Sequence, residues 1–562
     1  MLSSDYCKTI SKLRIERTLY EFSSEPFFGL FDAAMNGMIP HRFHVISSEP
    51  GSGKSKGIQK YLREYLDGGR GGVDTGIIIF LTRLDEIKSY IKGARLLRDD
   101  YAVLISGDRR GILKEYGGSS NPNEAPILFT TAQRFEARCG SSFEDSTDLF
   151  YRSKPRALRI WDEEFTPAKP STITLDRIKE LPALLRGSFN DLVLEVEKLE
   201  ASMNAAVAGD EIVIPIAMVP DAVRAMADTG LGPKDSRRKT LGALIELAGK
   251  PTRVMVPRGS SRSIIGEVSR FPLDLAPLFI LDASARVSGA YEIMERDGLP
   301  VTRYPAVGLS YRPATFHHLL TGAGKMTMKN KGKRKVVLHE AAEIINRDKD
   351  RWLIIYSRND GIDLEKELKD LCFDPSRLEF VYWGNHRASN DYRDCKKVIV
   401  LGLMRYPEDG YEGKRLSYRA NPKMRGVDID NIRVGEIRST MLQAITRSNI
   451  RNHDAGSCGA CEVFLVDSCK DLRDHIKAAF PEAGYNELPP SVVKLGGRQQ
   501  DILDHVASLP AIDLRRGIAR KAIYDALGIE RGNFGKLVRC PKFQKAAAEL
   551  GVAVERSKFV LL

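Results

Sequence analysis

The sequence predicts an α/β protein with two doubly wound parallel-sheet domains, a helical insertion and a C-terminal winged helix-turn-helix domain. Three observations predict this fold class. Short apolar runs alternate with helical periods over the first two-thirds of the chain, these runs fall into two groups, and the pattern is lost after about Pro489. Continuous apolar runs fit parallel strands that are covered on both faces, and the helices between them give the βαβ pattern.

The apolar runs are aliphatic or β-branched rather than alternating, as buried parallel strands are. The first group predicts strands at Phe43–Ser47, Ile77–Thr82, Ala102–Ile105, Ile127–Thr130, Leu158–Trp161 and Leu278–Asp282. The second group predicts strands at Lys335–Leu338, Trp352–Tyr356, Leu378–Tyr382, Lys397–Leu401 and Glu462–Val466.

These groups predict a first domain over residues 1–324, a second over 325–488 and a tail over 489–562. The first domain contains the insertion, at about 166–270, where helical periods cover Thr174–Ala201, Pro220–Ala227 and Lys239–Ala248. Lys325–Lys335 holds six basic residues and no apolar stripe, so we interpret it as the linker or cleft region between the domains. A plain solvated loop is the alternative.

Length and composition exclude several protein classes. At ~150 residues per domain, 562 residues suggest three to four domains. Hydrophobic residues make up 43% and charged residues 28%, which excludes collagen-like, disordered and disulfide-scaffold proteins. No apolar run is long enough for a membrane span, and the first residues lack the pattern of a secretory leader. With eight scattered cysteines, a cytoplasmic protein is expected, and its net charge of +12 favours a polyanionic partner.

A phosphate-binding loop follows the first predicted strand. Ser48-Glu49-Pro50-Gly51-Ser52-Gly53-Lys54-Ser55 leads into a helical period and matches the phosphate-loop signature, except that Ser48 replaces its first glycine. Backbone N–H groups of Gly51, Ser52 and Gly53 would surround phosphate oxygens. Lys54 would reach the β- and γ-phosphates, and Ser55 would bind Mg²⁺. A chance Gly/Ser-rich turn is the alternative.

An acidic segment, Asp162-Glu163-Glu164, follows the strand Leu158–Trp161. In phosphate-loop ATPases an Asp at a strand end holds Mg²⁺, and the next carboxylate polarises the attacking water. Asp162 and Glu163 fit these two roles. An ordinary surface turn is the alternative, but the upstream Lys54 favours the catalytic interpretation.

With these two motifs the chain resembles a superfamily two helicase, the DEAD/DEAH-like class with paired RecA-like domains. Further segments follow in the expected order. Phe80–Arg83 and Leu128–Phe135 resemble the two motifs that contact the nucleic-acid backbone, here through Thr82, Arg83, Thr130 and Thr131. Leu281–Ala285 resembles the Ser-Ala-Thr coupling motif, here Asp282, Ala283 and Ser284.

Two more segments of the resemblance lie in the second domain. His386–Asp391, before Lys397–Leu401, is similar to an Arg-Gly-x-Asp segment. Gln443–Arg451 resembles Gln-x-x-Gly-Arg-x-x-Arg, although Thr446 replaces Gly and the second Arg comes one residue late. Gln443, Arg447 and Arg451 lie four residues apart, which predicts one helix face, with a solvated basic face as the alternative.

The resemblance implies ATP and Mg²⁺ as cofactors, with Gln443 at the nucleotide. We see no adenine-reading Gln motif before the phosphate loop, so ATP is implied by the family alone. An Arg from the second domain, Arg447 or Arg451, would make hydrolysis depend on closure of two sheets around ATP. The stretch from Trp383 to Gly402 is similar to helicase-like proteins of phage and plasmid replication modules.

The tail resembles a helix-turn-helix over Ala522–Val538, with Gly528 at the turn. The second helix would present Arg531, Asn533, Lys536 and Arg539 to duplex DNA, and Val552–Val554 with Lys558–Leu561 would form a wing. Residues 511–562 hold eleven Lys/Arg and five Asp/Glu, a net charge of +6. A helical packing or oligomerisation domain is the alternative.

Cys458 and Cys461, with His453 and Cys469, are conceivable zinc ligands, or small buried residues. The whole pattern predicts an ATP-dependent DNA helicase or translocase, acting with replication proteins on a mobile element. A duplex-translocating packaging or restriction-type motor is one alternative, but Asp391, Asp394, Asp428 and Asp430 form no convincing nuclease set. A non-enzymatic initiator, for which ATP is only a switch, is the other.

Overall fold

The computed structural model describes residues 25–70, 74–256, 261–304, 309–384, 392–418, 427–454, 456–488 and 497–561. The chain divides into two compact units. Unit 1 comprises Met1–Pro313, Met404–Ala460 and Asp474–Ala483, and unit 2 comprises Ala314–Leu403, Cys461–Arg473 and Gly484–Leu562. Among the described residues, no helix is both long and apolar enough for a bilayer crossing.

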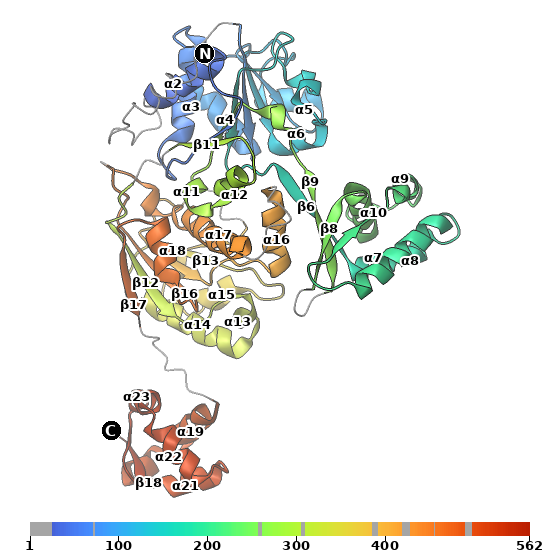
Figure 1. The fold of residues 1–562 in the computed structure, drawn as a ribbon. Coiled ribbons are helices and arrows are strands. Elements are labelled where there is room, and N and C mark those ends of the chain that lie inside the picture. The colour runs from blue at the N-terminus through green and yellow to red at the C-terminus, as the bar shows by residue number, and fades with distance from the viewer. Residues whose placement is uncertain are drawn as a thin grey trace. The chain divides into compact units, whose positions relative to one another are not determined.

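Unit 1 is built on a seven-stranded parallel sheet with the order β11-β1-β10-β5-β2-β4-β3. Figure 1 shows helices beside the strands of this sheet. All six strands predicted for the first domain are present, and β11 is an additional edge strand that pairs with β1. The strands are β1 (Phe43–Ile46), β2 (Ile77–Leu81), β3 (Tyr101–Leu104), β4 (Ile127–Thr131), β5 (Leu158–Asp162), β10 (Leu278–Leu281) and β11 (Val301–Tyr304).

Both faces of this sheet are buried, as continuous apolar strands require. In β2, for example, Ile77, Ile79 and Leu81 enter one core while Ile78 and Phe80 enter the other. The first core is covered by α2 (Glu25–Met35), α3 (Lys54–Leu66), α4 (Leu84–Ala94) and α5 (Arg109–Tyr116). The second is covered by α6 (Ala132–Arg138), α11 (Ala285–Ser288) and α12 (Ala290–Arg296), among others.

The insertion is not purely helical, so that prediction is wrong. It contains a four-stranded antiparallel sheet with the order β6-β9-β8-β7. Strands β8 and β9 are neighbours in the sequence, but β6 pairs with β9 and β7 pairs with β8 over long sequence separations, which no local pattern indicates. The helix predicted at Thr174–Ala201 is broken where Gly187 takes φ +91°. The elements are β6 (Ala168–Thr174), α7 (Leu175–Leu185), α8 (Asn190–Ala205), β7 (Glu211–Val213), α9 (Val219–Asp228), α10 (Ser236–Leu247), β8 (Pro251–Met255) and β9 (Ser263–Ser269).

Three later elements also belong to unit 1: α16 (Glu408–Ser417), α17 (Val427–Ile445) and the 3₁₀ turn η6 (Asn449–Arg451). Gly413 of α16 packs against Pro170 of β6, 3.3 Å from the position of an added Cβ. In α17, Gly435 lies against the carbonyl oxygen of Ser288, with no room for a side chain. Close contacts at these two glycines therefore pack both helices against unit 1.

Unit 2 holds a six-stranded parallel sheet with the order β14-β13-β15-β16-β12-β17. The α/β class with two parallel sheets is thus confirmed, and four of the five strands predicted for the second domain are present. The strands are β12 (Ala314–Leu320), β13 (Trp352–Tyr356), β14 (Leu378–Tyr382), β15 (Lys397–Leu401), β16 (Cys461–Asp467) and β17 (Gly484–Leu488).

The fifth predicted strand, Lys335–Leu338, is wrong because it lies inside α14 (Lys331–Ile345). Val337 and Leu338 belong to a buried helical face with Ala341, Ala342 and Ile345. The linker interpretation of Lys325–Lys335 is also wrong, since this segment forms α13 (Lys325–Lys329) and the first turn of α14. The lysines of this segment are exposed. The buried face of α14 continues beyond Lys335, so the segment by itself did not reveal a helix.

The C-terminal segment has its own hydrophobic core, which includes Phe534, Phe543 and Phe559. The two predicted strands are present and form an antiparallel pair, joined by a third short strand in the order β18-β20-β19. The elements are α19 (Gly497–Ser508), α20 (Ala511–Arg516), β18 (Ile518–Ala519), α21 (Arg520–Ala526), α22 (Arg531–Arg539), α23 (Pro541–Glu549), β19 (Val552–Val554) and β20 (Lys558–Leu561).

Candidate active site

The predicted catalytic segments meet at one edge of the seven-stranded sheet. Because all its strands are parallel, their carboxyl ends share this edge, where doubly wound folds bind ligands. Along the edge lie the end of β1 with the phosphate loop, then β10 with Asp282, β5 with Asp162, β2 with Thr82 and β4 with Thr131. The sheet order therefore brings together segments far apart in the sequence.

The phosphate loop adopts a shape that only glycine tolerates at two positions. Gly51 has φ +87°, and Gly53, with φ +84°, stands before the first turn of α3. A Cβ on Gly51 would lie 2.5 Å from the carbonyl oxygen of Arg451, so η6 packs directly on the loop. Within the described residues the buried Ser52 hydroxyl has no hydrogen-bond partner. The loop thus offers backbone curvature and a spare hydroxyl to a ligand.

Lys54 is held over this loop, where its ammonium donates to the carbonyl oxygen of Ser48 at 2.7 Å. Burial lowers the pKa of Lys54, and the carboxylates of Asp162, Asp282 and Glu49 oppose that shift. Arg451 lowers the pKa further, which places a second cation at the loop. The loop therefore carries concentrated positive charge beside an acidic cluster.

The acidic strand end faces this lysine. Burial, and then the neighbouring Glu163, raise the pKa of Asp162 to about 6, while Lys54 opposes the rise. Glu163 has φ +85°, a left-handed conformation that is strained for glutamate and typical of functional sites. Its carboxylate accepts a hydrogen bond from the Thr82 hydroxyl at 3.1 Å. The third acidic residue, Glu164, instead accepts from Tyr418 at 3.1 Å and pairs with Lys414 at 3.3 Å.

Sequence reasoning missed two residues of α4 that join this cluster. Tyr90 donates from its phenol to the Asp162 carboxylate at 3.2 Å. Burial, followed by the charges of Asp162 and Glu163, raises the pKa of Glu86 to about 8. Glu86 and Tyr90 lie one helical turn apart on α4, but Thr82 precedes that helix, so their spacing in the sequence did not single them out.

The predicted coupling segment is buried beside the acidic strand end. Asp282 accepts hydrogen bonds from the Ser284 amide at 2.8 Å, the Ser284 hydroxyl at 2.6 Å and the Tyr291 hydroxyl at 3.0 Å. Ala283, between Asp282 and Ser284 in the sequence, is partly buried. Gln443 approaches the Ser284 hydroxyl with its side-chain amide at 3.5 Å. Gln443 therefore contacts the coupling segment, and its predicted role at the nucleotide stays a prediction.

Arg447 and Arg451 both lie at the site, although not on one helix face. That expectation is wrong, since α17 ends at Ile445 and Arg451 ends the separate turn η6, which Ser448 caps. Burial, and then Arg451, lower the pKa of Arg447 to about 10, and Glu163 opposes this shift. Both arginines therefore lie close to the charged cluster, Arg447 near Glu163 and Arg451 near Lys54.

A buried ion pair that the sequence did not reveal connects the phosphate loop to α11. Arg286 contacts Glu49 at 2.7 Å and donates from its backbone to the Ser47 hydroxyl at 3.0 Å. Its guanidinium also donates to the carbonyl oxygens of Ala478 and Ala479, at 2.8 and 2.7 Å. Tyr311 donates to the same Glu49 at 2.7 Å. This network fixes the loop to the segment that follows the coupling motif.

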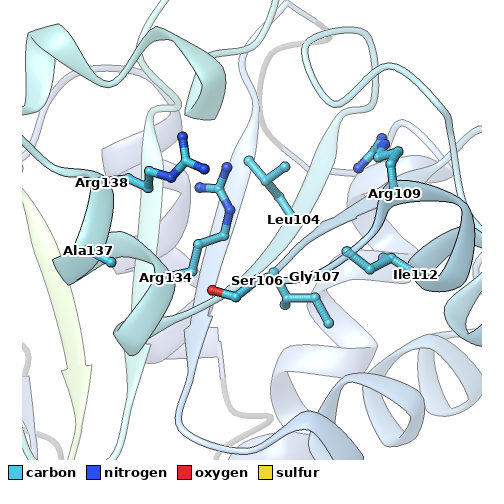
Figure 2. A pocket seen from close by; sticks show the side chains of 9 residues that line it. Leu104, Ser106, Gly107, Arg109, Ile112, Arg134, Ala137 and Arg138 are labelled. Atoms are coloured by element: carbon cyan, nitrogen blue, oxygen red, sulfur yellow. The ribbon is translucent and has the colours of Figure 1, made fainter. Parts of the chain in front are cut away.

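An arginine-lined cavity of about 230 Å³ lies at the other end of the sheet edge, beyond β3 and β4 (Figure 2). Arg109, Arg134 and Arg138 line it together with the backbone turn at Ser106 and Gly107. Arg134 is 9% exposed, and one of its guanidinium nitrogens has no partner among the described residues. The cavity therefore combines cations and a free buried donor, as a phosphate site requires.

The four residues predicted to contact nucleic acid in this domain take local roles in the structure. Thr130 is fully buried and donates to the Leu104 carbonyl at 2.6 Å. Thr131 caps α6 by accepting from the Arg134 amide at 3.2 Å. Arg83 pairs with Asp85 at 2.9 Å, and Thr82 donates to Glu163. Their contact with nucleic acid stays a prediction.

In the C-terminal segment, the four predicted DNA-contacting residues are all exposed on α22, whose Phe534 and Val538 face the core. They are Arg531, Asn533, Lys536 and Arg539. The turn before α22 has Gly528 at φ +59°. The geometry is that of an exposed basic helix beside a β-hairpin.

The zinc alternative gains no support from the geometry. Among the described residues, which include His453, Cys458, Cys461 and Cys469, no three His, Cys, Asp or Glu side chains are grouped to hold a metal ion. Cys458 and Cys461 are buried. His453 instead lies near Lys54 and Arg451, and burial followed by these cations lowers its pKa to about 4. The predicted segment His386–Asp391 lies outside the described residues.

No protein-family model matches the chain, and no curated protein matches it. Solved structures with a similar fold include apo XPD, at 12% identity and a TM-score of 0.49 over 83% of this chain and 100% of that one. Dbp5 of S. cerevisiae bound to RNA and ADP BeF3 follows, at 10% identity and a TM-score of 0.36 over 84% and 95% of the two chains.

The helicase Lhr of Mycobacterium smegmatis, bound to ssDNA and AMP-PNP, is similar at 11% identity and a TM-score of 0.34, over 94% of this chain and 57% of that one. At identities of 10–12% and TM-scores below 0.5, these similarities assign no function to this chain. The chemistry of the site therefore rests on this chain's own residues: a phosphate loop, an acidic strand end and two arginines in one compact unit.

Proposed function

We propose that the protein is an ATP-dependent helicase or translocase that couples ATP hydrolysis to movement on DNA. One observation carries this proposal. The phosphate loop with Lys54, the carboxylates Asp162 and Glu163, and the arginines Arg447 and Arg451 lie around one point of the first sheet edge. Cations for a triphosphate beside carboxylates for a metal and a water are what phosphoryl transfer to water requires.

The residues present fit ATP and Mg²⁺. Gly51, Ser52 and Gly53 supply the curved backbone and a spare hydroxyl for phosphate oxygens. Ser55 and Asp162 supply the oxygen donors that Mg²⁺ prefers. When bound, the metal would neutralise charge on the phosphates.

The remaining steps belong to the protein. Glu163, oriented by Thr82, would accept the proton of the attacking water. Lys54, Arg447 and Arg451 would stabilise the charge that develops on the γ-phosphate. Since Gln443 contacts Ser284 on the coupling segment, a shift of α17 would be passed to the sheet edge.

Nucleic acid would follow the same sheet edge beyond the nucleotide. The cavity lined by Arg109, Arg134 and Arg138 offers phosphate contacts next to Thr130 and Thr131. The exposed basic helix α22 would bind duplex DNA and give the motor a loading site. The faint similarity to phage and plasmid replication proteins favours a role in replication of a mobile element.

The test is ATPase activity measured without nucleic acid and with single-stranded DNA, duplex DNA or RNA. We expect stimulation by DNA, loss of activity in Lys54→Ala, and a fall of about 10²- to 10⁴-fold in kcat for Glu163→Gln, which removes the general base. Lys60→Ala is the control, because Lys60 lies on the same helix but is exposed. If both site variants hydrolysed ATP at the wild-type rate, the proposal would fail.

Strand-displacement and nuclease assays on the same preparation distinguish the alternatives. A helicase separates the two strands of a duplex. A packaging or restriction-type motor moves on duplex DNA without separating the strands, and a packaging motor of the terminase type also cuts the DNA. A replication initiator with an ATP switch would bind DNA and do neither.

The tail is tested in the full chain with Arg531→Ala/Lys536→Ala. Each lost phosphate contact should lower the slope of log affinity against log salt by about 1 for duplex DNA. Arg515→Ala/Arg516→Ala on α20 is the matched control for charge alone, since both arginines are exposed. Equal salt slopes in the three proteins would remove α22 from the DNA interface.

A further inference from the structure

Tyr90 of α4 connects the two side chains that the proposed function assigns to Mg²⁺. Its phenol donates to the Asp162 carboxylate at 3.2 Å, and the Ser55 hydroxyl lies close enough to the same phenol to influence its pKa. The serine belongs to the first turn of α3, while the aspartate ends β5. A tyrosine from a third element therefore joins the two oxygen donors.

The number of protons decides how Ser55 can interact with Tyr90. A phenol has one proton, and Tyr90 gives it to Asp162. Towards Ser55 the phenol oxygen can therefore only accept, so a hydrogen bond between the two hydroxyls would use the single proton of the serine. Both lone pairs of the Ser55 oxygen would then be left for a metal ion.

The phenol is held rigidly in this position. Tyr90 is 2% exposed, and its ring packs in the core below the sheet edge, 6.0 Å from the Phe129 ring centroid. One helical turn towards either end of α4, the backbone is fixed by the buried Ile87 and Ala94. The position of the hydroxyl is therefore set by the fold and not by the ligand.

We propose that Tyr90 is a positioning residue for Mg²⁺, which aims the lone pairs of Ser55 at the metal and holds one oxygen of Asp162 in place. Groups that orient metal ligands in this way commonly change metal affinity by 10- to 100-fold when removed. The inference rests on the proposed function, because it takes the ligand to be a magnesium–nucleotide complex.

The experiment compares the wild type with Tyr90→Phe, which removes the hydroxyl and keeps the ring. Binding of a fluorescent ATP analogue is titrated with Mg²⁺, and binding of Mn²⁺ in the presence of the nucleotide is followed by electron paramagnetic resonance. We expect the half-saturating metal concentration to rise about 10-fold or more, while metal-free binding of the nucleotide changes less than about twofold.

Tyr61→Phe is the matched control. Tyr61 is equally buried, on α3, and donates from its phenol to Asp32 at 2.9 Å, away from the two metal ligands. Its variant should leave the metal titration unchanged. In a Ser55→Ala background the effect of Tyr90→Phe should shrink, because one of the two oriented ligands is already gone.

An unchanged metal titration for Tyr90→Phe would overturn the inference. So would an equal loss of metal-dependent and metal-free nucleotide binding, since that result indicates a general structural role. The proposed function fails differently. Suppose that the wild type binds the magnesium–nucleotide complex and that Tyr90→Phe raises the half-saturating metal concentration as expected. If nucleic acid then fails to stimulate ATP hydrolysis, the proposed helicase or translocase function is wrong, while the inference about the metal site stands.

Discussion

At the scale of single residues, Gly51 shows how strictly the phosphate loop is constrained. Its φ of +87° disfavours any side chain, and an added Cβ would lie 2.5 Å from the Arg451 carbonyl oxygen. We expect Gly51→Ala to lose nucleotide binding and about 1 to 3 kcal/mol of stability, because both the loop and η6 must shift. Nucleotide titration and thermal unfolding measure the two effects.

Gly37→Ala separates the two causes. Gly37 also has a positive φ, +65°, but an added Cβ there would meet nothing within 4 Å. This control should lose stability through backbone strain alone and keep full nucleotide binding. Equal losses of binding in both variants would contradict the contact between loop and turn.

His453 gives the site a pH dependence of known sign. Its pKa is lowered to about 4, first by burial and then by the nearby Arg451 and Lys54, so the imidazole is neutral in the fold. Unfolded histidine takes up a proton near pH 6.5. Its contribution to stability is therefore complete above about pH 6.5 and is lost as the pH falls towards 4.

We expect His453→Asn, which does not titrate, to change this profile. Between pH 7 and pH 5 the wild type should lose about 1 to 2 kcal/mol more stability than the variant. Urea unfolding at the two pH values measures the difference. If the stability of the two proteins changed equally with pH, His453 would have the same pKa in the folded and unfolded states, which would contradict the prediction.

At the scale of elements, the ion pair of Glu49 and Arg286 joins the phosphate loop to α11. The two side chains are 5% and 15% exposed, so removing one leaves the other charge buried. We expect Arg286→Met to cost about 3 to 5 kcal/mol, and Glu49→Gln/Arg286→Met to recover part of this loss. Denaturant unfolding of the single and double variants gives the coupling energy.

Arg303→Met is the control for this prediction. Arg303 pairs with Glu292 at 2.6 Å, but the two side chains are 41% and 64% exposed, so water screens the pair. Its loss should cost less than about 1 kcal/mol. Similar costs at both sites would mean that the loop is not anchored by a buried charge.

At the scale of the whole molecule, the C-terminal segment has a separate core that predicts independent folding. Phe559 is fully buried, with Phe534 and Phe543 at ring distances of 6.4 and 6.3 Å. A fragment of residues 497–561 should unfold cooperatively with about 2 to 4 kcal/mol of stability, since so small a core supplies little more. Circular dichroism during heating tests this.

In that fragment, Phe559→Ala should abolish the cooperative transition, whereas Ile512→Ala should keep it because Ile512 is 60% exposed. A fragment without any cooperative transition would mean that the segment depends on the rest of the chain for its fold.

The predictions from sequence were most accurate where one short segment carries all of the signal. The strand before the phosphate loop, the strand ending at Asp162 and the helix beginning at Lys54 each have a local pattern that fixes their type. They were least accurate where a strand pairs with a segment far away in the sequence. Strands β6 and β9 pair across the whole insertion, and β12, for which no strand was predicted, pairs with β16 and β17.

The sequence alone determined the α/β class, the phosphate loop and the acidic strand end, because these depend on the order of neighbouring residues. Only the tertiary structure decided that Tyr90, Glu86 and His453 join the site and that Arg286 anchors the loop. The physical reason is that a parallel sheet brings the ends of distant strands to one edge. Which side chains meet there follows from strand order and helix packing, which no local pattern encodes.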